Sequence, residues 1–384
     1  MNGDQCITNC GRNAGAIPGG GSDMRRLSIV LAIAIAPCVS AGQAQSPSSG
    51  PYKVLKTAKV GGTGGFDYVY ADVAGRRLYI PRGGVAATAT APAIPGRITV
   101  FNLDTLAPVG EIPNTRGNGA AIDPKSGHGF ASSKPVAMWD TKTLALIKTI
   151  EVQGNPDGIL FDSFNDRVYV FSHAVPHTTV IDSKDGSVLG TIDLGGAPEQ
   201  AVADGKGHVY VDVSDKANVA VIDAKTMTVT AHYDLGGKGE GLAGLALDNK
   251  NHVLFVACRL PAPGVMVMLN ADDGKIITTL PLAGSSDGAV FNPTTMEAFS
   301  STGQMDGTLT IIKELGPNHF EVEQNLPTMA GAKTLTFDDK TDHVLLIGAA
   351  YVTPAAPATA PPAGGRGPGR TMVPDSFSII VVGK

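Results

Sequence analysis

Acidic residues recur at one position of a repeated pattern in this sequence. Seven apolar stretches end in an Asp or Asn residue, at positions 72, 123, 162, 204, 248, 292 and 338. Four of the residues five positions before these ends are carboxylates, and the full set is Asp67, Asn118, Asp157, Glu199, Ala243, Asp287 and Lys333. Glu240 stands near Ala243, the apolar exception. Converging carboxylates suit a hard cation such as Ca²⁺ or Mg²⁺, which takes six or more oxygen ligands.

Two interpretations of these acidic residues stay open from the sequence alone. In the first, Asp67, Asp157, Glu199 and Asp287 form a ring that binds Ca²⁺ or Mg²⁺, or a polyhydroxylated or cationic ligand. In the second, Asp and Glu side chains cap turns by accepting hydrogen bonds from local backbone N–H groups. The first interpretation predicts a functional site, and the second predicts a purely structural role.

Histidine and basic residues are further candidates for the same site. His173 and His177 flank a Val-Pro bend and are candidates for a general base or for metal ligands. The alternative is that both are ordinary loop histidines. Arg116, Arg259 and Lys333 could pair with an anionic ligand, although a solvated basic rim is the other reading.

A repeat of four short strands positions these residues. The units recur every 39 to 51 residues, and successive second strands read DRVYVFS (166–172), HVYVDVS (208–214) and HVLFVAC (252–258). Val, Ile, Thr and Tyr favour strands, and Asp-Gly pairs favour tight turns. Four strands per unit at this spacing are typical of a β-propeller blade.

Seven units predict an all-β, seven-bladed β-propeller of four-stranded blades that occupies 52–384 as a single domain. The last unit lacks a fourth strand, and residues 52–62 resemble an outer strand. We therefore expect the N-terminal strand to complete the last blade and close the ring. Two Ala/Pro/Gly-rich loop insertions, at 83–96 and 352–374, interrupt the period. The candidate site residues fall in loops on one face, around the mouth of the central channel.

The strands VYVFS, VYVDVS and LFVAC, with TVIDSKDG and AVIDAKTM after the turn, resemble the YVTN-type, YncE-like seven-bladed propeller family. The resemblance covers about residues 52–384. It implies a secreted or periplasmic propeller, and relatives include lactonase-like hydrolases, cofactor-bearing dehydrogenase subunits and proteins of unknown role. The chain departs from the family pattern because most blades lack the Asn that often follows the second strand. The chain contains no CxxCH motif, so the sequence does not indicate a c-type haem.

The N-terminal region predicts export. Residues 1–23 are polar and without periodicity, and they read either as an upstream start-site artefact or as a long n-region. Residues 24–44 hold Met-Arg-Arg, a short apolar run and small residues, a pattern typical of a signal peptide that is cleaved near Ala44. We expect a periplasmic or secreted protein, monomeric and without a transmembrane segment in its mature part.

Composition narrows the function classes. The chain has 48 Gly, 26 Pro, 17% charged and 5% aromatic residues, and a net charge of −5, which together argue against disorder, coiled coils and nucleic-acid binding. No standard catalytic motif is present. The first hypothesis is a periplasmic scaffold that binds a small polar ligand or a protein at the channel mouth. The alternative is a metal-assisted hydrolase or lyase of the lactonase type with its site there.

Overall fold

The computed structural model describes residues 49–89, 91–303, 307–316, 318–352 and 371–384. All of them belong to one compact unit, Gln45–Lys384. The expected upstream segment 1–23, the signal peptide 24–44 with its cleavage point, and most of the loop 352–374 lie outside the described residues. Within the described residues, no helix is long and apolar enough to cross a membrane.

The chain forms seven four-stranded antiparallel sheets, and each of these blades is named below by its innermost strand. Three successive blades are β2 (Tyr70–Asp72), β3 (Arg77–Arg82), β4 (Arg97–Asn102), β5 (Pro108–Pro113); β6 (Gly117–Asp123), β7 (His128–Ser133), β8 (Val136–Asp140), β9 (Leu146–Ile150); and β10 (Pro156–Asp162), β11 (Arg167–Ser172), β12 (Thr178–Asp182), β13 (Val188–Ile192).

The next three blades repeat this order of strands. They are β14 (Pro198–Ala203), β15 (His208–Val213), β16 (Asn218–Asp223), β17 (Thr228–Asp234); β18 (Glu240–Asp248), β19 (Val253–Leu260), β20 (Val265–Asn270), β21 (Ile276–Pro281); and β22 (Ser286–Asn292), β23 (Glu297–Thr302), β24 (Thr308–Gly316), β25 (His319–Pro327). A 3₁₀ turn, η1 (Ser214–Lys216), follows β15, and β28 (Tyr351–Val352) pairs with β29 (Thr371–Met372) in a two-stranded sheet.

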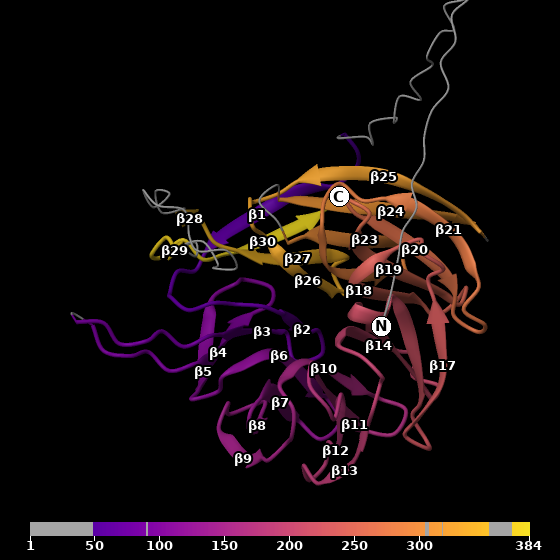
Figure 1. Cartoon of the computed structure of the whole chain (residues 1–384). Coiled ribbons are helices and arrows are strands. Elements are labelled where there is room, and N and C mark those ends of the chain that lie inside the picture. Colours follow the sequence, from indigo (N-terminus) through magenta and orange to yellow (C-terminus); the bar gives the residue numbers. More distant parts are fainter. Residues whose placement is uncertain (1–48, 90, 304–306, 317, 353–370) are drawn as a thin grey trace, which may run out of the picture. The chain divides into compact units, whose positions relative to one another are not determined.

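The last blade closes the ring, as the sequence predicts. It contains β26 (Lys333–Asp338), β27 (His343–Gly348) and β30 (Ser378–Gly383), and β1 (Lys53–Lys59) pairs with β30 as its outermost strand. Figure 1 shows β1 beside β30, although they stand at opposite ends of the described chain. The innermost strands contact one another in sequence order, and β2 contacts β26. The seven-bladed propeller is therefore confirmed.

A buried carboxylate stabilises this closure. Glu297, on β23, is fully buried. The hydroxyl of Tyr52 donates to its Oε2, while Lys313 and Lys384 donate to its Oε1 at 3.1 and 2.9 Å. One side chain of the β22 blade thus holds residues that adjoin both closing strands.

The repeated Asp and Asn residues at the ends of the innermost strands are turn-forming residues. In six blades the side-chain Oδ1 accepts the backbone N–H two residues later, as in Asp123 to Lys125 at 2.8 Å and Asn292 to Thr294 at 2.8 Å. Asp72 accepts the N–H of Gly75 instead. Short polar side chains form such Asx turns readily, so this element of the repeat sets the reversal from first to second strand.

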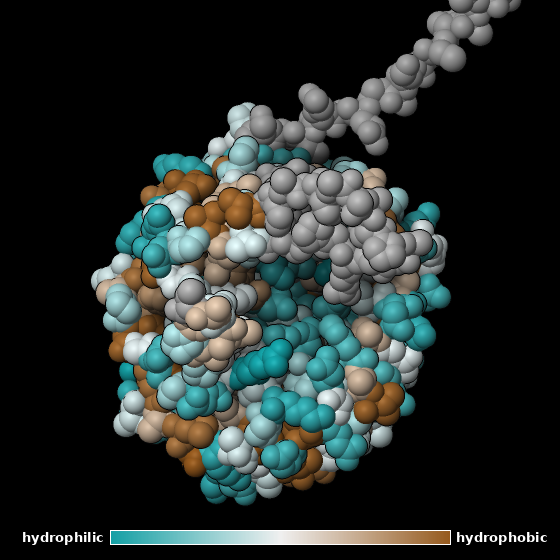
Figure 2. Space-filling model, turned by 60° about the vertical axis from the view of Figure 1, so that its left-hand side comes forward, coloured by the Kyte–Doolittle hydropathy of each residue, from teal (hydrophilic) through white to brown (hydrophobic). Residues whose placement is uncertain are grey.

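The core lies between neighbouring blades. The second and third strands are almost entirely buried, as in β8 and β12, whereas several outermost strands, such as β9, are mostly exposed. Val, Ile, Leu and aromatic side chains fill the space between sheets, and Trp139 is completely buried. Figure 2 shows a face of the molecule on which hydrophilic residues gather around a central hollow.

Candidate functional site at the channel mouth

The candidate residues occupy irregular positions at the start of the innermost strands. The register of the β6, β10, β14 and β22 strands shifts where Asn118, Asp157, Glu199 and Asp287 stand, and the register of β26 shifts just after Lys333. A β-bulge leaves its residue outside the regular ladder and redirects the side chain. The bulges therefore present these polar groups at one end of the channel.

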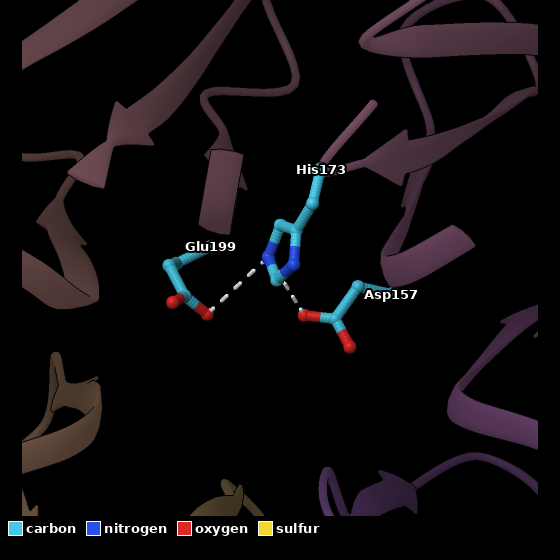
Figure 3. A group of neighbouring side chains, drawn as sticks. All are labelled: Asp157, His173 and Glu199. Carbon is cyan, nitrogen blue, oxygen red and sulfur yellow. Dashed lines mark ion pairs between the residues drawn. The ribbon is translucent and has the colours of Figure 1, made fainter. Parts of the chain in front are cut away.

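We call the polar residues at this end of the channel the channel-mouth ring: Asp67, Asn118, Asp157, His173, Glu199, Arg259, Asp287 and Lys333. Asp157, His173 and Glu199 form one half of it (Figure 3). Nε2 of His173 lies 3.3 Å from Oδ2 of Asp157 and 3.9 Å from Oε2 of Glu199. One ligand atom of each residue lies within 4.8 Å of the others. Asp157 is buried, Glu199 is half-buried and the side chain of His173 is 39% exposed, so the group is open on the histidine side.

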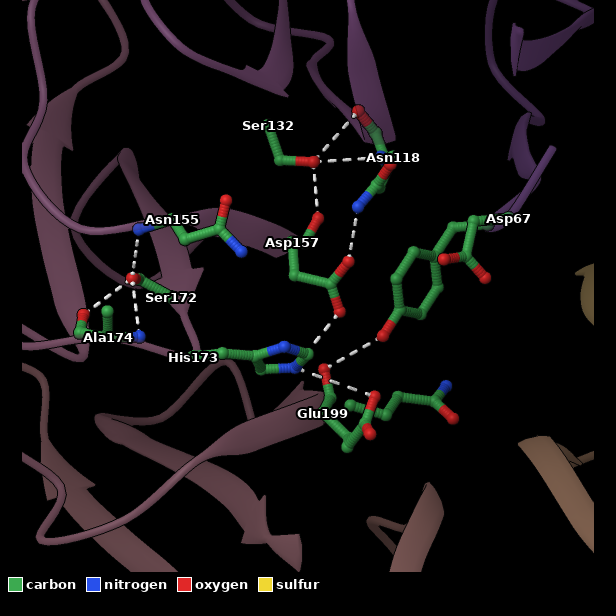
Figure 4. A network of polar contacts seen from close by, with 12 residues as sticks. Asp67, Asn118, Ser132, Asn155, Asp157, Ser172, His173, Ala174 and Glu199 are labelled. Atoms are coloured by element: carbon green, nitrogen blue, oxygen red, sulfur yellow. Dashed lines mark hydrogen bonds and ion pairs between the residues drawn. The ribbon is translucent and has the colours of Figure 1, made fainter. Parts of the chain in front are cut away.

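Backbone and side-chain contacts hold these three residues in place (Figure 4). Nδ2 of Asn118 donates to Oδ1 of Asp157 at 2.5 Å, and the hydroxyl of Ser132 donates to the carbonyl of Asp157. His173 follows the last residue of β11, and its N–H donates to the carbonyl of Asn155 at 3.3 Å. The donors around Asp157 direct its second carboxylate oxygen toward His173.

The other half of the ring alternates carboxylates with cations. Arg259 lies 3.6 Å from Glu199 and 3.0 Å from Asp287, and Nζ of Lys333 lies 3.0 Å from Asp287 and 2.9 Å from Asp67. The sequence predicts a ring of carboxylates, whereas the structure places Arg259 and Lys333 between them. Asp67 and Asp287 are therefore neutralised by protein cations.

Burial and mutual charge shift the pKa values of this ring. Burial raises the pKa of Asp67 and of Glu199, although Lys333 and Arg259 respectively act in the opposite direction. Burial alone would lower the pKa of Lys333, but Asp287 and Asp67 outweigh it and raise the value. Arg259 is raised for the same reason, by Glu199 and Asp287. Both cations are thus fixed in the charged form.

Asp212, on β15, holds the backbone at Glu199, one of the ring residues. It is completely buried, and its Oδ1 accepts the N–H groups of Glu199 and Gln200 at 3.2 and 2.6 Å. Its Oδ2 has no hydrogen-bond partner among the described residues. Burial and the nearby Glu199 raise its pKa well above the ordinary value. The signal for this residue was present in the sequence as a charged residue inside the apolar strand HVYVDVS.

Gln200 links three blades inside the channel. Its Oε1 accepts the N–H groups of Leu245 and Ala289, at 3.1 and 3.0 Å, and its Nε2 donates to the carbonyl of Ala289. A cavity of about 230 Å³ adjoins it, and the lining includes Tyr68, Glu199, Ile159 and Val290. The mouth therefore leads to a small cavity with a polar end and apolar walls.

Within the described chain, three of the residues that the sequence suggests for the site form no hydrogen bond or ion pair with the channel-mouth ring. Nδ1 of His177 lies 2.5 Å from Oδ1 of Asp193, the residue after β13. Glu240 is exposed at the start of β18, and Arg116 is exposed just before β6. Among the described residues, no hydrogen bond or ion pair joins Glu240 or Arg116 to the ring.

The donor set indicates which metal ions suit the site. Two carboxylates and one imidazole fit ions such as Zn²⁺ or Mn²⁺, whereas Ca²⁺ and Mg²⁺ prefer oxygen ligands alone. From the sequence we expect Ca²⁺ or Mg²⁺ for the carboxylates, with His173 and His177 as separate candidates for metal ligands. Asp67 and Asp287 are paired to Lys333, so the group whose ligand atoms converge is Asp157, His173 and Glu199, although Glu199 also lies 3.6 Å from Arg259.

Comparison with known proteins identifies the fold and nothing finer. No family model and no curated protein matches the chain. A chain from the crystal structure of the mitotic checkpoint complex has 10% identity and a TM-score of 0.63, and the match covers 84% of this chain and 95% of that chain. The β-propeller domain of Cps50 (Swd1) from Myceliophteria thermophila has 13% identity and a TM-score of 0.59, with coverages of 78% and 96%. U3-55K has 12% identity and a TM-score of 0.64, with coverages of 87% and 99%.

Proposed function

We propose that this chain is a YVTN/YncE-like propeller that binds a small polar ligand at the channel mouth, through a divalent metal site formed by Asp157, His173 and Glu199. The observation that carries the proposal is the convergence of these three side chains, whose ligand atoms lie within 4.8 Å of one another. Asn118 already orients Asp157, so part of the site is ordered in advance. Such preorganisation favours binding because less side-chain freedom is lost.

The ring also defines the kind of ligand that we propose. Arg259 adjoins the proposed metal site through Glu199, 3.6 Å away, and Lys333 follows it around the mouth through Asp287, so both cations are held by carboxylates. A ligand with a carboxylate or several hydroxyl groups could approach the metal and these cations together. A protein partner that presents such groups is the other occupant, since a chain of similar fold belongs to the mitotic checkpoint complex.

Calorimetric titration of the purified protein with Zn²⁺, Mn²⁺, Ca²⁺ and Mg²⁺ tests the metal site. We expect Zn²⁺ or Mn²⁺ to bind at one site per chain, and His173→Ala and Asp157→Asn to weaken binding at least about tenfold. His319→Ala is the matched control, because His319 is exposed on the β24–β25 hairpin. Absence of heat with millimolar Zn²⁺ and Mn²⁺, or unchanged affinity in His173→Ala, contradicts the proposal.

A metal-assisted hydrolase of the lactonase type is the second candidate. The observation that favours it is the exposure of His173 beside two carboxylates, since a zinc ion held by these residues would lower the pKa of a bound water molecule to about 7. Hydrolysis of a model lactone by the metal-loaded protein should stop in Asp157→Ala and Glu199→Ala. If the protein binds the metal but does not hydrolyse the lactone, the hydrolase candidate is excluded and only the binding function remains.

We further propose that the protein is exported and that its signal peptide is removed near Ala44. The support is the basic, apolar and small-residue order of positions 24–44. Fractionation of the expressing cells and sequencing of the mature N-terminus test this. Recovery of the intact chain in the cytoplasm would contradict it.

A further inference from the structure

A second cavity of about 600 Å³ lies between the last blade and the first, and its lining shares no residue with the channel-mouth ring. Its walls come from β1 and the residues that follow it, from the end of β3, from β4, from the β4–β5 turn and from β5. Charged side chains in this lining are Lys59, Arg82, Arg97 and Glu111, so the lining carries a net positive charge. Cavities of this volume are typical of sites for small organic ligands.

Arg82 is a buried cation without a carboxylate partner. The residue is only 1% exposed, and its guanidinium Cζ lies 3.7 Å from the centre of the Phe377 ring. Its nitrogens donate to the carbonyls of Gly64, at 3.1 and 3.3 Å, and of Gly61, at 3.5 Å. Among the described residues, no Asp or Glu forms an ion pair with it. A buried charge that lacks a counter-ion is costly, and burial together with Arg97 lowers the pKa of Arg82 to about 10.

Arg97 reaches the same point from the adjacent strand. Its Nε lies 3.3 Å from Glu111, and its Nη2 makes a long contact, 3.4 Å, with the carbonyl of Thr63. Its Nη1 is buried and has no hydrogen-bond partner among the described residues. A Cβ placed on Gly62 would lie 3.5 Å from Nη2 of Arg97 and 3.9 Å from Nη1 of Arg82. Both guanidinium groups therefore lie close to Gly62, near enough for the charge of Arg97 to act on Arg82.

We propose that this cavity binds an organic anion, an apolar compound with a phosphate or carboxylate group, whose charge pairs with Arg97 and Arg82. The planar guanidinium group matches the geometry of both anions and can bind them through two parallel hydrogen bonds. Val100, Phe101 and Leu106 also line the cavity and provide contacts for the apolar part. This site is independent of the proposed metal site because it shares no residue with the channel-mouth ring.

Calorimetry with phenyl phosphate, benzoate and the neutral compound phenol tests the proposal on the full chain. We expect phenyl phosphate or benzoate to bind and phenol to bind at least about tenfold more weakly, since the charge-assisted hydrogen bonds are lost. Arg97→Gln should weaken anion binding at least tenfold. Arg116→Gln is the matched control on an exposed arginine, and Arg259→Gln reports on the channel mouth. No heat with either anion at 10 mM, about the weakest affinity of interest for such a site, overturns the proposal.

Glu111→Gln provides a second test that does not depend on the folding of the arginine variant. Glu111 is exposed and lies beside Arg97, so its removal frees one guanidinium nitrogen without disturbing the core. We expect the affinity for phenyl phosphate to rise about threefold or more. Affinity that is unchanged in Glu111→Gln, or that falls in Arg259→Gln but not in Arg97→Gln, overturns the assignment to this cavity.

Discussion

The ammonium group of Lys333 lies 2.9 Å from Oδ1 of Asp67, although 266 residues separate them. Lys333 begins the innermost strand of the last blade, and Asp67 precedes the innermost strand of the first. Their ion pair therefore crosses the junction at which the ring closes. Because Asp287 also contacts Lys333 at 3.0 Å, one cation joins three consecutive blades.

Replacement of Lys333 by Met should destabilise the fold. Two half-buried carboxylates lose their counter-ion, so we expect the free energy of unfolding to fall by about 1–2 kcal/mol, less than for a fully buried pair. Urea denaturation measures the change, and Lys225→Met, on an exposed turn, is the control. Adding Asp67→Asn to Lys333→Met should recover part of the loss. A Lys333→Met protein as stable as the control would show that this junction does not depend on the ion pair.

The Glu297 cluster predicts loss of stability in acid. Burial alone would raise the pKa of Glu297, but the nearby hydroxyl of Thr295 and the hydrogen bonds from Tyr52, Lys384 and Lys313 outweigh it and lower the value to about 2. Because the folded-state pKa is below the ordinary value of 4.5, the stabilisation is present above pH 4.5 and is lost as the pH falls toward 2. We expect the full contribution to be roughly 3 kcal/mol.

Glu297→Gln separates this group from the other carboxylates. The variant should be less stable than the wild type at pH 6, and the difference should shrink between pH 4.5 and pH 2. Glu321→Gln is the control, since Glu321 is exposed on β25. Urea denaturation at fixed pH values gives the comparison. A constant difference across this range would be inconsistent with a lowered pKa at Glu297.

Asp212 offers a test of how the ring is supported. Asp212→Ala leaves the N–H groups of Glu199 and Gln200 without their acceptor, and we expect a loss of about 2 kcal/mol in stability together with weaker metal binding. Asp212→Asn keeps the acceptor oxygen. Because the pKa of Asp212 is raised, its stabilising contribution declines as the pH rises above the ordinary value, so Asp212→Asn should be at least as stable as the wild type at pH 8.

Thermal or urea unfolding of both Asp212 variants at pH 5 and pH 8, with zinc titration of the folded proteins, checks this prediction. The result that would contradict it is equal loss of stability and of metal affinity in the Ala and Asn variants. That outcome would mean that the charge, and not the acceptor geometry, supports Glu199.

The propeller could be predicted from the sequence because its determinants are local. Each Asx turn depends on contacts two residues apart, as between Asp123 and Lys125, and each strand shows its own β-branched pattern. Closure by the N-terminal strand followed from the missing fourth strand of the last repeat. The strand pattern recurs in all seven units and the contact to the residue two positions later in six of them, so the repeat is a stronger signal than any single unit.

The partners within the site could not be predicted in the same way. The spacing of Asp157, Glu199 and Asp287 identified positions, but the bulges at those positions decide where the side chains point. The sequence also placed Arg259 and Lys333 on the correct face without indicating that they pair with the ring carboxylates. Such contacts join residues far apart in the chain, and a single sequence does not show which of these residues lie next to one another.

The pairing of β1 with β30 determines the order in which the protein can be completed. Lys53–Lys59 are synthesised long before Ser378–Gly383, so the first strand of the propeller must remain without its partner until the last one is made. Until then the last blade has an open edge, and unpaired edges are sites of aggregation. For an exported chain, this edge would persist throughout passage across the membrane. The strand that closes the ring is therefore also the segment that most needs protection while the protein is still being made.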